Sequence, residues 1–302
     1  MTDNKKNLGR AALFLATLIW GISFVLMDLA LNNITTLYIL AFRFLGAAVI
    51  LLIAGFRELK KLSWRYVGAG ALMGVVLFTA YAFQTYGLMR TTPGKNAFLT
   101  AAYCIIVPFL YWLVNKKRPD RYNIMAAVIG LGGVGLISLN DNFQLGVGDA
   151  LTLVCGFFFA VHIIVTSKAV DNRIPVLLTM LQFAVAGIIA GVLALIFEPV
   201  PQNIPPATIW NLVFMAVAST ALCIYLQVYG QKHTPPAQAS VIMTFEAVFG
   251  AAASIVFCGE VLSLKLGLGF LLSFAAFIIS ETKLEFLKKR SRLSENNDVY
   301  RV

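Results

Sequence analysis

The sequence predicts an all-α integral membrane protein, with ten transmembrane helices arranged as two inverted five-helix repeats around a central cavity. Three observations predict this fold: the composition, the spacing of the apolar stretches and an internal repeat. Of the 302 residues, 59% are hydrophobic and only 13% are charged. A soluble domain of this size needs more polar residues to cover its surface. The chain is therefore expected to lie in a membrane.

A helix needs about 20 apolar residues to cross the hydrocarbon core of a bilayer. Short connections separate the apolar stretches, so no soluble domain is expected between them. The first stretch follows a basic segment, as in a signal peptide, but it is long and is assigned as a helix. In chain order the predicted spans are Ala11 to Leu31, Leu37 to Phe56, Tyr66 to Met89, Asn96 to Asn115, Tyr122 to Asn140, Ala150 to Ser167, Ile174 to Phe197, Ala207 to Gln231, Ala237 to Gly259 and Leu262 to Ser280.

The second five spans repeat the first five. Five residues recur without a gap 143 positions later, namely Gln84, Tyr86, Gly87, Thr91 and Pro93 as Gln227, Tyr229, Gly230, Thr234 and Pro236. The first two spans match the sixth and seventh at an offset of 139, and the proline-rich connection 198–206 takes up the difference. Because each copy holds an odd number of spans, the copies must have opposite orientations. The predicted units are residues 1–143, residues 144–282 and a charged tail, 283–302.

The net charge of +10 does not indicate nucleic acid, because the basic residues fall on one side of the predicted membrane. The N-terminus, alternate connections and the C-terminal tail hold 20 of the 24 Lys and Arg residues. Cytoplasmic loops carry this excess of positive charge. The sequence thus predicts a multi-pass protein of the cell membrane with both termini in the cytoplasm. It leaves a monomer and a homodimer open.

No cofactor or metal site is predicted. The four cysteines lie within spans, form no CxxC pair and have no histidine cluster nearby. Glycines recur instead where helices can approach closely, at Gly70 and Gly74 and in the run from Gly130 to Gly135. Small faces of this kind carry much of the helix association in membranes.

Few polar residues lie at mid-depth, where an ionisable side chain is costly. Asn96, Thr100 and Tyr103 share one helix face, and Glu246 is the repeat partner of Tyr103. Two related faces that meet at the midplane predict a substrate site. Glu246 can exchange a proton or bind a cationic group; the alternative is a neutral or paired acid that fixes helix packing. The predicted substrate-binding residues are Trp20, Ser23, Tyr81, Asn96, Thr100, Tyr103, His162, Tyr225, Met243 and Glu246.

Three further polar residues are assigned structural roles: Arg43, Gln84 and Gln227. Arg43 lies about 10 Å into the second span, by the 1.5 Å rise per residue. It is expected to pair with backbone carbonyls or an acid in preference to a substrate carboxylate. For His162, a satisfied hydrogen bond inside the protein is the alternative to a ligand or proton-relay role.

The chain resembles the EamA family of the drug/metabolite transporter superfamily over nearly its whole length. The segments that carry the resemblance are Trp20 to Phe24, Phe42 to Phe44, Gly94 to Leu113 and Phe245 to Glu260. It implies ten helices, a cavity formed chiefly by the first, third, fourth, sixth, eighth and ninth, and alternating access for small metabolites. It places Arg43 on an outer or supporting helix. The chain departs from the family at Lys117, where an acid is common, and at Ala247, where a proline is common.

We therefore expect a secondary transporter that exports small metabolites such as amino acids or related compounds, and not an enzyme. It is either coupled to protons, with Glu246 as the candidate residue, or facilitative. Two other classes of membrane protein are the alternatives. A membrane-embedded lipid-modifying enzyme needs nucleophiles, acid–base pairs or metal ligands, and no such set is evident. A passive channel needs a ring of charge or an open pore, and neither is evident.

Overall fold

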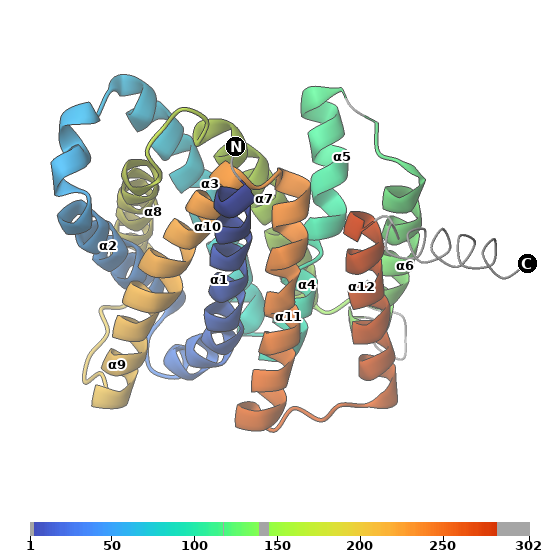
Figure 1. Cartoon of the computed structure of the whole chain (residues 1–302). Coiled ribbons are helices and arrows are strands. Elements are labelled where there is room, and N and C mark those ends of the chain that lie inside the picture. Colours follow the sequence, from blue (N-terminus) through green and yellow to red (C-terminus); the bar gives the residue numbers. More distant parts are fainter. Residues whose placement is uncertain (1–2, 117, 139–144, 283–302) are drawn as a thin grey trace, which may run out of the picture.

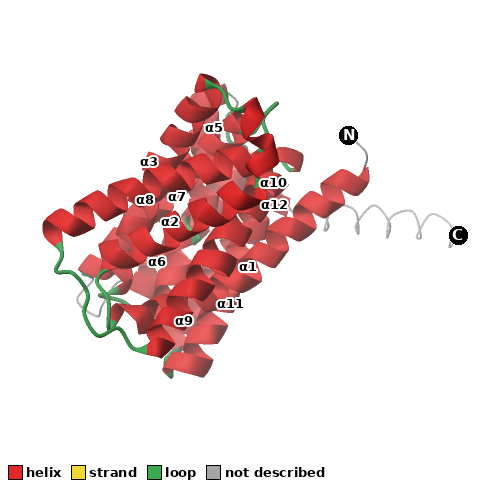
Figure 2. Ribbon diagram, turned by 90° about the vertical axis from the view of Figure 1, so that its left-hand side faces the viewer, coloured by secondary structure: helices red, strands yellow, loops and turns green. Residues whose placement is uncertain are grey.

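The computed structural model describes residues 3–116, 118–138 and 145–282. These residues form helices joined by loops, with no β-strand among them (Figure 2). The predicted tail 283–302 and the end of the fifth predicted span lie outside the described residues. The elements are α1 (Asp3–Leu31), α2 (Thr36–Ala54), η1 (Phe56–Lys61), α3 (Trp64–Leu88), α4 (Pro93–Thr100), α5 (Tyr103–Asn115), α6 (Arg121–Ser138), α7 (Val147–Ala169), α8 (Pro175–Phe197), α9 (Pro206–Phe214), η2 (Met215–Leu222), α10 (Cys223–His233), α11 (Pro236–Cys258) and α12 (Leu264–Thr282).

Eight helical segments among the described residues are long and apolar enough to cross a membrane. Two of them combine shorter elements, α4 with α5 and α9 with η2 and α10. The all-helical, multi-pass character predicted from the sequence is confirmed. The apolar parts of α6 and α12 are shorter, at 121–137 and 264–276, so the count of ten spans remains a prediction.

The fourth and eighth predicted spans are not regular helices. Between α4 and α5 the chain tightens at Ala101 and Ala102, where the amide of Cys104 bonds the carbonyl of Ala101 three residues back. Pro108 follows inside α5 and has no N–H to donate to the carbonyl of Cys104. The eighth span contains η2, a π-helical segment, between α9 and α10. Such segments are often found at functional sites.

Local sequence explains where several helices begin and end. Proline occupies the first turn of α4, α8, α9 and α11, where its missing N–H costs nothing. The side chain of Thr92 caps α4 by accepting from the amide of Lys95 at 3.3 Å. Gly259, with φ of +66°, ends α11 in the left-handed conformation that glycine tolerates.

The two ends of the bundle differ in charge. We call the end with the N-terminus, η1 and the α7–α8 and α10–α11 connections the basic end, at the top of Figure 1. The opposite end carries the α1–α2, α3–α4, α8–α9 and α11–α12 connections and is called the acidic end. There Glu198 accepts from the amide of Leu37 at 2.9 Å, and Thr91 donates to Asp149 at 2.6 Å.

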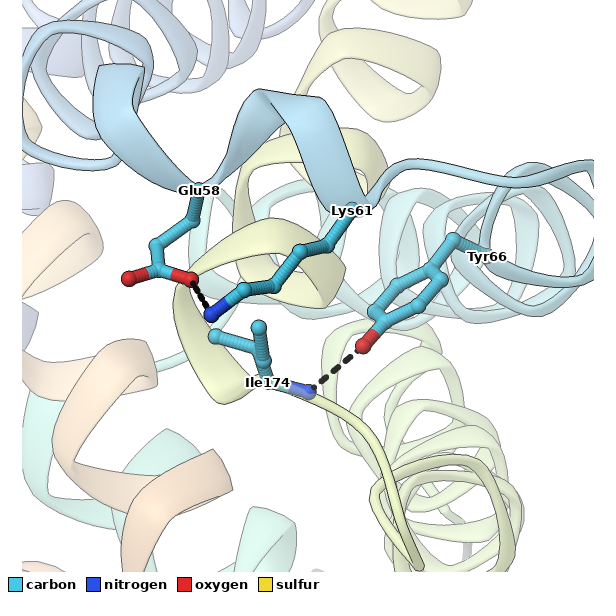
Figure 3. Close-up of polar contacts among 4 residues, drawn as sticks. All are labelled: Glu58, Lys61, Tyr66 and Ile174. Atoms are coloured by element: carbon cyan, nitrogen blue, oxygen red, sulfur yellow. Dashed lines mark hydrogen bonds and ion pairs between the residues drawn. The ribbon is translucent and has the colours of Figure 1, made fainter.

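At the basic end, η1 and the start of α3 lie beside the start of α8 (Figure 3). The hydroxyl of Tyr66 accepts from the amide of Ile174 at 3.0 Å, just before α8 begins. Lys61 pairs with Glu58 at 2.7 Å on the surface. The hydrogen bond from Lys61 to the Glu58 carboxylate raises the pKa of the lysine.

Small residues bring the helices together, as the sequence predicted. The most extensive contacts join α6 with α12, α2 with α8, α1 with α11 and α3 with α7. A Cβ added to Gly74 would lie 2.6 Å from the carbonyl oxygen of Gln182, and one added to Gly133 would lie 2.7 Å from the amide of Ser273. Each of the four helix pairs with the most extensive contacts combines one helix of the first half of the chain with one helix of the second. The core therefore lies between the halves, and so does the cavity described next.

Candidate functional site

A cavity lies between the halves, with about 50 Å³ of room for the centres of water molecules. One water needs about 10–15 Å³ by this measure, so the cavity has room for a few waters or a small solute. Its lining is mostly apolar with a few polar groups, as in sites for small molecules. The lining residues are Trp20, Ser23, Phe24, Met27, Arg43, Tyr81, Gln84, Thr85, Leu88, Asn96, Thr100, Tyr103, Phe159, Ile163, Ser219, Ile224, Gln227, Met243 and Glu246.

Eight of the ten predicted substrate-binding residues line this cavity, and His162 and Tyr225 do not. His162 is buried, and its Nε2 atom lies 2.9 Å from Oε1 of Gln182. Tyr225 instead packs against Tyr229, with 6.5 Å between the ring centroids. Arg43, Gln84 and Gln227, which were assigned structural roles, also line the cavity. Substrate binding by any of these residues stays a prediction.

The lining follows the internal repeat. At the offsets of 139 and 143 residues, six pairs of equivalent residues line the cavity with both members. Four members of these pairs, Phe24, Phe159, Ile163 and Ile224, were not predicted as site residues. Applying the offsets to Trp20 and Tyr81 would have found Phe159 and Ile224, whereas Phe24 and Ile163 are both apolar and gave no polar signal. The six pairs are Trp20 with Phe159, Phe24 with Ile163, Tyr81 with Ile224, Gln84 with Gln227, Thr100 with Met243 and Tyr103 with Glu246.

Glu246 is the only acidic residue in the lining of this cavity. It is buried near the middle of α11, and the hydroxyl of Tyr103 from α5 faces its carboxyl group. A carboxyl group that is removed from water but faces a small cavity can exchange a proton or bind a cation there. Among the described residues no salt bridge joins it to a basic side chain.

Arg43 is the basic residue of the lining. Its Nε donates to Thr220 Oγ1 at 2.8 Å, and an Nη donates to Ser219 Oγ at 3.3 Å. The guanidinium carbon lies 4.6 Å from the centre of the Tyr81 ring, a cation–π contact. These partners differ from the backbone carbonyl or acid expected from the sequence. The residue also faces the cavity, although the family resemblance placed it on a supporting helix.

The π-helical segment η2 supplies the partners of Arg43. Its Ser219 also accepts from the indole N–H of Trp20 through the backbone carbonyl, at 2.9 Å. The apolar pattern predicted a continuous helix here, not a π-helical segment. One signal was available: Ser219 and Thr220 are polar, whereas their repeat partners are Val76 and Leu77.

Asn96 lies where α4 meets α3 and α7. Its amide nitrogen donates to the carbonyl of Gln84 at 3.2 Å and to Thr152 Oγ1 at 2.8 Å. Thr100, one turn later, accepts from the Gln84 side chain at 3.2 Å. These hydrogen bonds hold Asn96 and Thr100 in place, so both side chains also stabilise the packing of the helices.

On the basic side of the cavity, α1 and α10 are in direct contact. A Cβ added to Gly230 would lie 2.5 Å from Leu13 Cγ and 2.9 Å from the carbonyl oxygen of Gly9. Cavity residues Met27 and Leu88 lie near the ends of α1 and α3 at the acidic end. The cavity thus extends from the middle of the bundle toward the acidic end. Among the described residues, no His, Cys, Asp and Glu side chains group as a metal site.

Comparison with known proteins identifies the family. The model of the EamA-like transporter family matches twice, over residues 7–139 and 146–282. An uncharacterized transporter of Archaeoglobus fulgidus is 29% identical over 269 residues, covering 89% of this chain and 84% of the relative. The uncharacterized transporter YoaV of Bacillus subtilis is 24% identical, covering 85% of this chain and 90% of the relative.

The fold is similar to that of a protein solved by crystallography. The two share 14% sequence identity with a TM-score of 0.71, over 92% of this chain and 98% of the other. At this identity the likeness concerns the fold alone. The family itself follows from the two matches to its model and from the relatives named above. The chain belongs to the EamA-like transporter family of the drug/metabolite transporter superfamily and is a multi-pass membrane transporter.

Proposed function

We propose that the protein is a secondary transporter that exports small metabolites, with amino acids and related compounds as the leading class, in exchange for protons. The substrate binds in the cavity between the two halves, which alternately open it to either side of the cell membrane. The observation that carries this proposal is a cavity lined by repeat-related residues whose single acid is Glu246.

The two halves, residues 1–143 and 144–282, act as inverted five-helix repeats in this proposal. The path of the chain supports it: α1 begins at the basic end, whereas α7, its equivalent, begins at the acidic end beside Thr91. The basic end faces the cytoplasm, because basic residues are retained on that side. Both termini then lie in the cytoplasm.

Proton coupling follows from competition at one carboxylate. Glu246 can hold a proton or a cationic group of the substrate, but not both at full strength, so loading one favours release of the other. The result is exchange of the substrate for a proton. The charged and titratable groups that border the same cavity or lie within electrostatic range of Glu246 come from five neighbouring helices: Arg43 of α2, Tyr81 of α3, Tyr103 of α5, Cys155 of α7 and Cys223 of α10.

The test is flux into liposomes that are more acidic inside than outside, which an exchanger of this kind uses to accumulate substrate. Glu246→Gln is expected to lose gradient-driven accumulation and to remain folded, judged by its melting temperature. Glu198→Gln is the matched control, because Glu198 bonds the start of α2 outside the cavity. Gradient-driven flux that survives Glu246→Gln would rule out the coupling role.

A further inference from the structure

The guanidinium of Arg43 is buried without a carboxylate partner. The side chain is 2% exposed. Among the described residues, no Asp or Glu lies within salt-bridge distance of it. A cation in this position is costly unless its charge is compensated, and hydroxyl groups compensate it only in part. The site therefore favours an anion that the protein itself does not supply.

Arg43 also retains free hydrogen-bond donors. A guanidinium has five N–H groups. Two are donated to Thr220 and Ser219, and the Tyr81 hydroxyl is a further partner. At least two N–H groups then remain, which is the number that a carboxylate accepts in a bidentate pair. The hydroxyl groups and the Tyr81 ring hold the guanidinium in a fixed orientation, and with it the remaining N–H groups.

The repeat-equivalent position in the second half carries no charge. The equivalent residue in the second half is Gln182, which lies outside the cavity lining and pairs with His162 at 2.9 Å. The partner of His162 in the first half, Ser23, bonds the carbonyl of Ile19 in its own helix at 2.7 Å. The first half thus leaves its polar residue at this position turned toward the cavity, and that residue is a cation.

We infer that Arg43 binds the carboxylate of the transported substrate, while Glu246 receives its ammonium group. This inference rests on the proposed transport function and narrows its substrate to zwitterionic amino acids. A zwitterion compensates both buried charges at once, whereas an amine leaves Arg43 unpaired and a carboxylate without an ammonium group leaves Glu246 to be neutralised by a proton. The neighbouring side chains Phe24, Phe159, Ile163 and Met243 are apolar, so they favour an apolar side chain on the substrate.

The direct test uses three compounds of similar shape in reconstituted liposomes: leucine, leucinamide and 4-methylpentanoate. Leucine carries both charges, leucinamide lacks the carboxylate and 4-methylpentanoate lacks the ammonium group. The wild-type protein is expected to transport leucine at least about tenfold better than leucinamide, given the strength of hydrogen bonds to charged groups. Equal transport of leucine and leucinamide overturns the role of Arg43 and leaves the transport function intact.

Variants then assign the preference to one side chain. Arg43→Gln is expected to bring the leucine to leucinamide ratio close to one, whereas Arg43→Lys keeps the charge and part of the preference. Arg10→Gln is the control, because Arg10 is exposed and bonds Gln238 outside the cavity. A purely structural role for Arg43 would lower all three fluxes in proportion, with the ratio unchanged. This outcome also overturns the inference.

The two hypotheses fail in different ways. If Arg43→Gln does not fold, the wild-type ratio and Arg43→Lys still decide the matter. If none of the three compounds moves and the metabolite that is exchanged is not a zwitterionic amino acid, the zwitterion assignment is wrong and the transporter stands. If no metabolite of a wide panel moves through a folded protein, the proposed function itself is contradicted.

Discussion

Single carboxylates hold helix ends together at the acidic end of the bundle. Glu260, just after α11, accepts from the hydroxyl of Thr92, from the amide of Gly94 at 3.2 Å and from the hydroxyl of Ser254 at 2.6 Å. It thereby places a negative charge at the N-terminus of α4, the end of a helix that favours anions. An acid from the second half thus fixes the start of the helix that carries Asn96 and Thr100.

Glu260→Gln is expected to destabilise the protein by about 1–2 kcal/mol. The carboxamide keeps one acceptor, so one of the three donors loses its partner, and the charge at the helix N-terminus disappears. The melting temperature in detergent measures the loss. Glu58→Gln is the control, since Glu58 forms only a surface pair with Lys61 and should change stability by less than about 0.5 kcal/mol. Equal effects of the two variants would contradict the capping role.

Part of the cavity could be predicted residue by residue, because depth in the membrane selects its polar members. Glu246, Tyr103 and Asn96 stand out in the sequence because a polar side chain at the middle of a membrane span is energetically costly. Rotation about the helix axis is harder to predict. The side chain of His162 could point toward the cavity or toward Gln182, and packing between α7 and α8 decides which. Both helices are buried on several sides, so their apolar pattern does not predict this orientation.

Helix boundaries show what apolar length alone cannot predict. Span positions follow from hydropathy, but the tightened turn at Ala101 and Ala102 and the π-helical η2 depend on hydrogen bonds that one window of apolar residues does not encode. In η2, Ser219 and Thr220 turn toward Arg43, so the irregular segment and the buried cation are one feature. The depth of Arg43 and the polar pair Ser219 and Thr220 are visible in the sequence, but their pairing depends on the contact between α2 and η2.

Helix α3 provides a test of close packing with a control in the same helix. Gly74 faces α8, where an added Cβ would lie 2.6 Å from the carbonyl oxygen of Gln182 and 2.8 Å from Val185 Cβ. Backbone cannot move aside as a flexible side chain can. Gly74→Ala is therefore expected to lower stability by about 1–3 kcal/mol through overpacking.

Gly68 lies on the exposed face of the same helix, with no atom within 4 Å of an added Cβ. Gly68→Ala should leave stability unchanged or raise it by up to about 1 kcal/mol, since alanine favours the helix. Melting temperatures of both variants in the same detergent give the comparison. A Gly74→Ala variant as stable as Gly68→Ala would show that α3 and α8 are less closely packed than described.

The whole molecule combines symmetry in the cavity wall with asymmetry in its charges. Six equivalent pairs line the cavity, so each half contributes a similar surface to the same space. The ionisable groups break this symmetry: Arg43 comes from the first half and Glu246 from the second. In the proposed cycle the two halves exchange which side is open, and a substrate that bridges these charges contacts both halves throughout.

Inverted orientation of the halves can be tested by labelling single cysteines in a variant that lacks the 4 native ones. Asn33 and Gln202 are exposed at the acidic end, one in each half, and Leu62 and Asp171 are exposed at the basic end, again one in each half. A membrane-impermeant thiol reagent applied to intact cells is expected to label Asn33→Cys and Gln202→Cys. Leu62→Cys and Asp171→Cys should react only after permeabilisation, because basic loops stay in the cytoplasm. Permeabilised cells, in which all four must react, provide the control. Labelling that pairs Asn33 with Asp171 and Leu62 with Gln202 would instead place equivalent loops of the two halves on the same side of the membrane, and this outcome rules out inverted halves.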